Sequence, residues 1–246
     1  MDMQKLRLVI LAVVLAGASN ASASVTLTFV NVSPYGIVNL QVKAAGANVI
    51  SFPFSGGVYA GIYNQVLSVN GGPPVSTPSF CIDVSREITF GETFTDYSYT
   101  SLNLAPLAPA GPMGTVAAAD VEKLWAAYYT PSTANALDAA ALQVAIWKVV
   151  AQQVGTYTVT VSDYPGYSGV TAESNIMLAN LPNLTAEANL VGLVSPNGQN
   201  YVVVPPPNLT LVPEPPTMIA GVLLLLPFGA STLRLLRKSA NGVTVA

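Results

Sequence analysis

The hydrophobic periodicity of this chain changes twice along its middle section, and that change restricts the fold more than any other feature. Apolar residues alternate with other residues over 24–32, and the ranges 37–43 and 58–69 read similarly. A period of two is typical of half-buried β-strands. Apolar residues then recur at helical spacing over 115–130 and return to a strand pattern over 191–204. This order of strands, helices and strands predicts an α+β fold.

The central section predicts two to three helices with recognisable ends. Thr115 is the expected N-cap of the first helix, and Pro131 is expected to end it because proline lacks the backbone N–H. Asn135, with Asp138 three residues later, resembles a capping box at the start of a second helix over 136–153. Apolar residues cover most sides of this second helix, so we expect it to be buried.

Shorter segments complete the expected domain. They are strands over 80–84 and 157–161, an irregular loop over 104–114, a third helix over 171–181, and a closing hairpin over 191–204. Together these elements predict one compact α+β domain from residue 24 to residue 204.

Composition excludes several classes of functional site. The 246 residues include no His and one Cys, which excludes Ser-His-Asp catalysis, His-ligated zinc or haem, and an intramolecular disulfide framework. We therefore expect no metal and no cofactor. With 9 Lys and Arg in all, and a formal charge of −6 over 24–212, the chain is a poor candidate for nucleic-acid binding.

The N-terminus has the pattern of a secretory signal peptide. A short basic region, Met1 to Arg7, precedes an apolar run of nine residues, Leu8 to Ala16, which is too short to span a bilayer. Ala21 and Ala23 then supply small residues at the −3 and −1 positions of a cleavage site. We expect export through the Sec translocon, with cleavage that removes residues 1–23.

The C-terminus has three parts in a fixed order. A proline-rich spacer over 205–216 is expected to be stiff and extended, and an apolar helix follows over 217–238. A basic stop closes that helix, and by the positive-inside rule it would keep the tail 239–246 in the cytoplasm. The basic stop consists of Arg234, Arg237 and Lys238.

This arrangement resembles the PEP-CTERM sorting signal. The resemblance rests on Val212, Pro213, Glu214 and Pro215, followed by the apolar helix and the basic residues, and it covers about 27 residues. Proteins with this signal are substrates of an exosortase in Gram-negative bacteria that make exopolysaccharide. The resemblance implies transient anchoring in the inner membrane and then transfer to the envelope surface or the extracellular matrix.

Two residues of the domain can carry chemistry. Cys81 is an isolated thiol in an exported protein, where free thiols risk oxidation, and Gln143 is an amide on a helix crowded with apolar residues. A buried amide costs free energy unless it is satisfied. Attack of the thiol on the amide carbonyl would release ammonia and leave an internal thioester, which would resolve both problems.

The surroundings of these residues resemble the bacterial surface thioester domain. An aromatic-Cys-aliphatic-Asp strand is followed by a helix with Gln-x-Ala-Ile-Trp, over roughly 80 residues from Ser79 to Gln153. In that family the Cys and the Gln correspond to Cys81 and Gln143. The expected pocket residues are Phe80, Asp83, Leu142, Ile146 and Trp147.

Other interpretations remain open. Cys81 and Gln143 can be an inert pair in the core, because Cys is among the most often buried residues. Four carboxylates within fourteen residues could instead hydrolyse a glycan or bind calcium. They are Asp83, Glu87, Glu92 and Asp96.

We therefore expect an exported binding or adhesion module without catalytic turnover. Each molecule would acylate one target, which would be a surface amine or hydroxyl or an exopolysaccharide. A structural biofilm-matrix protein without a reactive bond is the first alternative. An envelope glycan hydrolase is the second.

Overall fold

The computed structural model describes residues 24–44, 49–51, 57–107, 110–154, 157–207 and 209. The expected signal peptide, the sequence Val212 to Pro215, the apolar helix and the basic stop lie outside these residues. Within the described part, no helix is long and apolar enough to cross a membrane.

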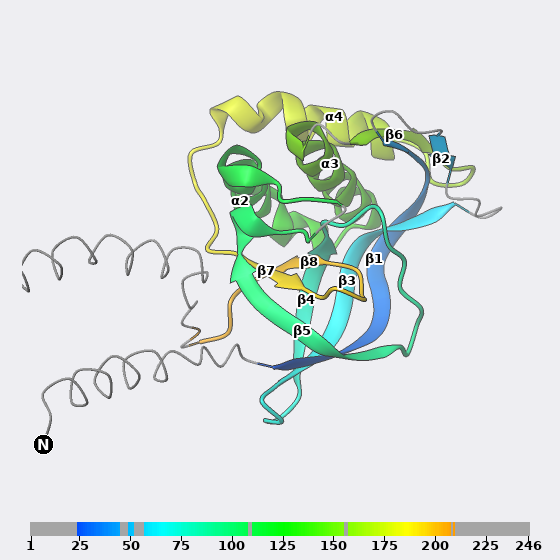
Figure 1. Cartoon of the computed structure of the whole chain (residues 1–246). Coiled ribbons are helices and arrows are strands. Elements are labelled where there is room, and N and C mark those ends of the chain that lie inside the picture. The colour runs from blue at the N-terminus through cyan, green and yellow to red at the C-terminus, as the bar shows by residue number, and fades with distance from the viewer. Residues whose placement is uncertain are drawn as a thin grey trace, which may run out of the picture. The chain divides into compact units, whose positions relative to one another are not determined.

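A closed antiparallel barrel of six strands forms one half of the domain (Figure 1). Each strand pairs with the next around the ring, and β5 pairs with β1 to close it. In order around the barrel the strands are β1 (Val25–Ala44), β3 (Val58–Val69), β4 (Val75–Cys81), β8 (Tyr201–Val203), β7 (Val191–Val194) and β5 (Thr93–Ser101). Closure satisfies the strand edges that an open sheet would expose.

Strand β1 is longer than the sequence predicts. The pattern indicates separate strands over 24–32 and 37–43, but β1 runs without interruption through Ser33 and Pro34. Its pairing with β3 shifts register between Phe29 and Asn31, and again before Tyr35. Buried positions are odd-numbered as far as Phe29 and even-numbered from Val32, because the extra residue at the first shift moves the following side chains to the other face.

The far half of β1 leaves the barrel. It pairs with β2 (Val49–Ser51) on one side and with β6 (Tyr157–Asp163) on the other. On that second side, β5 pairs with β1 only as far as Thr28, and β6 begins at Val38. The loop between β4 and β5 enters this gap, where Phe29 N–H donates to the Glu92 oxygen and Gly91 N–H donates to the Phe29 oxygen.

Three helices lie together against the barrel (Figure 1). They are α2 (Gly114–Ser132), α3 (Ala136–Val154) and α4 (Val170–Asn180), with short 3₁₀ turns at η1 (Leu102–Leu104) and η2 (Leu181–Asn183). Helix α3 is central, because it contacts both other helices and strands β1, β3, β4 and β6. The expected burial of this helix is confirmed, since 139–147 are all buried.

The helix ends agree only partly with the sequence. Asn135 Oδ1 accepts the Leu137 N–H at 2.9 Å, which confirms Asn135 as the cap of α3. Helix α2 begins one residue before Thr115, and its N-cap is Met113 without a side-chain bond. Pro131 lies inside the last turn and does not end the helix, which continues to Ser132.

The mixed α and β class, the hairpin β7–β8 and the position of the third helix are confirmed. The strand expected over 80–84 ends at Cys81, and β5 was not expected at all. In β5 only Tyr97 is buried, so its sequence lacks an alternating apolar pattern.

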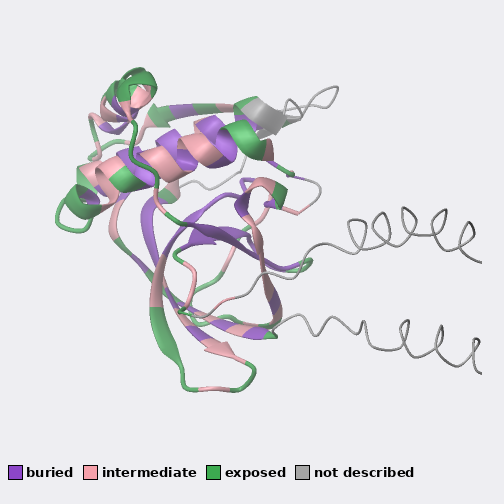
Figure 2. Ribbon diagram, turned by 90° about the vertical axis from the view of Figure 1, so that its left-hand side faces the viewer, coloured by how far each residue is buried: buried purple, intermediate pink, exposed green. Residues whose placement is uncertain are grey.

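The core lies between the helices and the barrel end that faces them. Along β4, exposed residues near Val75 give way to three buried residues that end at Cys81. The same change is visible in Figure 2, where the strands are green and pink toward the hairpin turn between β3 and β4, and purple beneath the helices. The strand end that meets the helices carries Cys81, so this residue is fully buried.

Candidate functional site

Cys81 and Gln143 meet in the core through two hydrogen bonds. The Cys81 backbone N–H donates to Gln143 Oε1 at 2.9 Å, and Gln143 Nε2 donates to the Cys81 backbone oxygen at 2.8 Å. Both residues are fully buried. The structure therefore brings together the two residues that the sequence selects, 62 positions apart, with the amide carbonyl polarised by the N–H of the cysteine itself.

This contact follows from the way the strands end. Strand β3 pairs with β4 only as far as Tyr63 and Ser79, while the Ile82 N–H bonds to the Asn200 oxygen on the other side. Because backbone groups alternate in direction along a strand, the N–H and C=O of Cys81 point away from β8. The Gln143 amide forms hydrogen bonds with both groups, as a peptide group of β3 would if that strand continued to pair with β4.

The thiol itself is held protonated. Cys81 Sγ donates to the Asp83 backbone oxygen at 3.3 Å, and the Asp83 N–H approaches the sulfur at 3.4 Å. Burial raises the pKa of the Cys81 thiol from 9.0 to about 12, and the nearby Asp83 charge adds to this, while the Trp147 side chain acts in the opposite direction. A thiol with this pKa is a poor nucleophile at neutral pH.

The Asp83 carboxylate holds the neighbouring loops in place. It is fully buried, accepts the Ser85 N–H at 3.0 Å, and accepts a short hydrogen bond from Asn200 Nδ2. Arg86 Nε lies 3.8 Å from it, and Arg86 Nη1 donates to the Ser195 and Gly198 oxygens. Since its oxygens are already engaged, Asp83 is a structural anchor of the site and not an available base.

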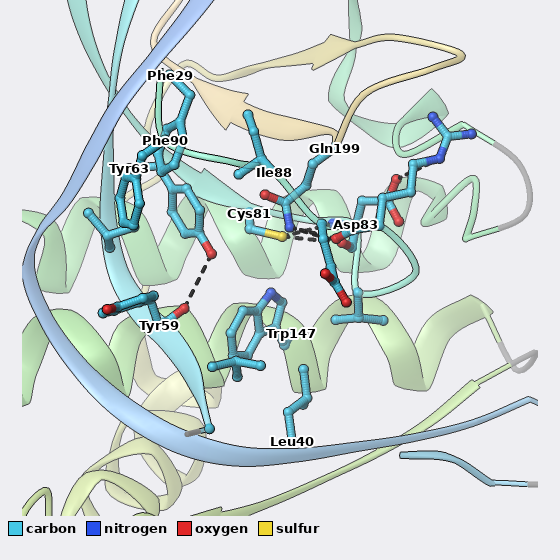
Figure 3. Close-up of a pocket in the computed structure, with 16 residues that line it drawn as sticks. Phe29, Leu40, Tyr59, Tyr63, Cys81, Asp83, Ile88, Phe90, Trp147 and Gln199 are labelled. Atoms are coloured by element: carbon cyan, nitrogen blue, oxygen red, sulfur yellow. Dashed lines mark hydrogen bonds and ion pairs between the residues drawn. The ribbon is translucent and has the colours of Figure 1, made fainter. Parts of the chain in front are cut away.

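A pocket of about 210 Å³ opens above the sulfur (Figure 3). It lies at the gap between β5 and β6 along β1, beneath the loop that connects β4 to β5. Most of its walls are aromatic or aliphatic, with two exposed rings, Tyr59 and Phe90. The side chains labelled in the figure are Phe29, Leu40, Tyr59, Tyr63, Cys81, Asp83, Ile88, Phe90, Trp147 and Gln199.

Trp147 contributes a buried donor that is not used. Its indole Nε1 has no hydrogen-bond partner, although the side chain is only 2% exposed. Figure 3 shows the indole nitrogen pointing up toward the Cys81 sulfur. Trp147 lies one helical turn after Gln143, so both side chains leave α3 on the same face.

The expected pocket residues divide into two groups. Asp83 and Trp147 line the pocket. Phe80, Leu142 and Ile146 lie in the core cluster between the helices and the barrel, where they support the site from behind. Sequence reasoning missed Tyr59, Tyr63, Ile88, Phe90 and Gln199 as pocket residues. Their contribution depends on strand register and on the path of a loop, and no local pattern marks it.

The four carboxylates do not gather in one place. Glu87 lines the pocket with Asp83. Glu92 accepts the Thr89 N–H, and Asp96 binds the Ser195 hydroxyl and the Asn197 amide at the far end of the hairpin β7–β8. Over the described residues, no group of three or more Cys, Asp or Glu side chains could hold a metal ion.

Comparison with known proteins gives a distant structural similarity. The chain is similar to the N-terminal thioester domain of a surface protein from Clostridium perfringens, at 11% sequence identity and a TM-score of 0.36. The similarity covers 68% of this chain and 98% of that chain. No family model and no curated protein matches the chain. These values are too low to transfer the role of any residue from that protein to this one.

Proposed function

We propose that this chain is an exported binding module of the bacterial surface, in which Cys81 and Gln143 form an internal thioester that captures a target covalently. The observation that carries this proposal is the double hydrogen bond between the Gln143 amide and the Cys81 backbone. These bonds hold the Gln143 amide against the backbone of the residue that carries the thiol, and both residues are fully buried. The sequence resemblance around these residues points the same way.

The bond would form without any further reactant. Cys81 Sγ attacks Cδ of Gln143, the C–N bond breaks, and the thiol proton leaves with Nε2 as ammonia. Negative charge develops on Oε1 during the attack, and the Cys81 N–H at 2.9 Å is placed to stabilise it. The high pKa of the thiol, about 12, leaves little thiolate at neutral pH, so this reaction would be slow.

Burial would then preserve the thioester, and the pocket would give access to it. Exclusion of water from the core limits hydrolysis of a stored acyl group. A target amine or hydroxyl that enters the pocket would attack the Gln143 carbonyl, and the sulfur would leave and recover a proton. The product is an amide or ester between the target and Gln143. Each molecule reacts once, so the chain is a covalent binder and not a catalyst with turnover.

Delivery to the surface is part of the proposal and rests on sequence alone. The N-terminal signal would direct the chain to the Sec translocon. The motif Val212 to Pro215, with the basic residues that follow, would direct it to an exosortase-type enzyme of a Gram-negative bacterium. The module would then act in adhesion, at the envelope or in an exopolysaccharide matrix.

Intact mass of the purified full chain tests the thioester directly. A deficit of about 17 Da is expected in the native chain, from the expelled ammonia, and its absence is expected in Cys81→Ala and Gln143→Ala. Gln152 is an exposed glutamine on the same helix, so Gln152→Ala should keep the deficit. Methylamine should add about 31 Da to the chain that carries the bond.

The neutral thiol supports one alternative, a matrix protein in which Cys81 and Gln143 are only structural. Full mass in the native chain, with one alkylatable thiol after unfolding, would exclude covalent capture and leave Cys81 and Gln143 as a structural pair. Sustained turnover of a polysaccharide, lost on replacing Glu87, would instead indicate the glycan hydrolase.

A further inference from the structure

The pocket wall contains a buried donor, the indole N–H of Trp147, that has no hydrogen-bond partner. A buried donor without an acceptor is unfavourable, so native proteins rarely keep one without a use. This donor lies in the pocket wall beside Cys81, and it points at the sulfur (Figure 3). No hydrogen bond to the neutral thiol is formed.

The sulfur needs donors only when it is charged. In the resting thiol, Sγ donates its proton to the Asp83 oxygen and receives one N–H, from Asp83. When the C–S bond of a thioester breaks, the electron pair stays on sulfur until the proton of the attacking amine reaches it. During that interval the contact with the Asp83 oxygen becomes repulsive, and the Asp83 N–H alone is a weak partner for an anion in a fully buried site.

We propose that the Trp147 indole N–H is the second donor that stabilises the Cys81 sulfur whenever it carries negative charge. This inference rests on the proposed thioester for its biological use, but it concerns the sulfur and can be tested without the bond. Burial raises the pKa of the Cys81 thiol, whereas Trp147 lowers it, as expected of a group that stabilises the thiolate. Trp147 is thus assigned to the reaction as a donor in the pocket wall that faces the reacting sulfur.

Other titratable groups near the sulfur must stay constant for this test. Burial raises the pKa of Tyr63, Tyr97 and Tyr201 above the ordinary tyrosine value, so these three side chains remain neutral over the pH range of the experiment. Helix α3 presents Trp147, which does not titrate. The titratable groups from the surrounding strands and loops are Tyr59, Tyr63, Tyr97, Tyr201, Asp83, Arg86 and Glu87.

The matched variants are Trp147→Phe and Trp125→Phe. Both tryptophans are buried, but Trp125 lies in α2 and does not line the pocket. Its ring stacks on that of Tyr129, with 4.7 Å between the ring centroids. In a Gln143→Ala background the thiol stays free in every molecule. Its rate of alkylation by iodoacetamide, measured over a series of pH values below its pKa, follows the small thiolate fraction. Trp147→Phe should lower this rate about tenfold at each pH, and Trp125→Phe should leave it unchanged.

A second measurement uses the intact bond. In the full chain that carries the mass deficit, Trp147→Phe should slow the opening by methylamine by about tenfold, because the sulfur is the leaving group. Equal alkylation rates with Trp147 and Phe at position 147 would overturn the role of the indole N–H. If Trp147→Phe does not fold, benzothienylalanine at position 147 keeps the bicyclic shape, lacks the N–H, and should show the same tenfold loss.

The two proposals fail in different ways. A native chain of full mass refutes the thioester, while the alkylation series still decides the role of Trp147. A native chain with the deficit, whose opening rate is indifferent to Trp147→Phe, keeps the thioester and removes the tryptophan from its chemistry.

Discussion

The side-chain amide of Gln143 is bonded at both ends to the backbone of Cys81, at 2.9 Å from the cysteine nitrogen and 2.8 Å to its oxygen. One side chain of α3 thereby completes the hydrogen bonding of the last residue of β4. The contact ties the central helix to the barrel, and it presents the amide carbonyl to the residue that carries the thiol.

Replacing Gln143 with Ala should destabilise the domain by about 2–4 kcal/mol, because it leaves the buried N–H and C=O of Cys81 unpaired and opens a cavity. Urea unfolding of the full chain measures this. Gln152→Ala, on the exposed part of the same helix, should change the unfolding free energy by less than about 0.5 kcal/mol. Equal effects of the two substitutions would contradict the contact.

The free thiol should be protected by its high pKa. In a Gln143→Ala chain at pH ~8, a thiol with a pKa of about 12 reacts about a thousandfold more slowly with iodoacetamide than one with a pKa of 9.0. The same chain unfolded in urea supplies the reference rate. Similar rates in the folded and unfolded chains would show that the thiol is neither buried nor held protonated.

Asn200 should be essential for the loops around the site. Its Nδ2 donates to the buried Asp83 carboxylate, and its Oδ1 accepts the Ser195 N–H at 3.1 Å. Asn200→Ala should therefore cost about 2–4 kcal/mol of unfolding free energy, since a buried carboxylate loses a partner. Asn183→Ala, at an exposed position, is the control and should be nearly neutral. A tolerated Asn200→Ala would mean that Asp83 is not anchored in this way.

Asp163 should make the start of α4 sensitive to acid. Its carboxylate accepts the Thr171 hydroxyl and N–H and the Gly169 N–H, and these bonds lower the pKa of Asp163. A lowered folded pKa stabilises the fold above the unfolded pKa, near 3.8, and this stabilisation is lost as the pH falls through the lower folded value.

Asp163→Asn should accordingly lower the thermal midpoint at pH 7, and the difference from the native chain should shrink toward pH 2. Asp120→Asn, the same substitution at a position on α2, provides the comparison. A difference between Asp163→Asn and the native chain that grows in acid would have the wrong sign for this explanation.

Local patterns in the sequence were sufficient to predict the helices and the contact between Cys81 and Gln143. Asn135 marks the start of α3, because a cap depends on bonds within a few residues. The apolar residues around Gln143 already indicate that this amide is buried and needs a partner, and Cys81 is the one thiol available to it. The predictions that α2 is capped by Thr115 and ended by Pro131 were wrong, since both residues are tolerated within the terminal turns of a helix.

The pairing of strands that lie far apart in the sequence could not be predicted from local patterns. Nothing between Thr93 and Ser101 has an alternating apolar pattern, yet this segment closes the barrel through Tyr97 and its pairing with β1. The bulges that carry β1 through Ser33 and Pro34 also depend on the partner strand and not on the local sequence. The pocket exists because β5 and β6 leave a gap along β1, which a distant loop fills with Phe90 and Ile88.

The sequence by itself therefore determined the strands and helices that have local signals, and it singled out the thiol and the amide. Periodicity, caps and buried polar groups act over a few positions, so they can be recognised without the fold. The barrel closure, the pocket and the unpaired N–H of Trp147 emerged only on folding, because each depends on the register between segments that lie tens of residues apart.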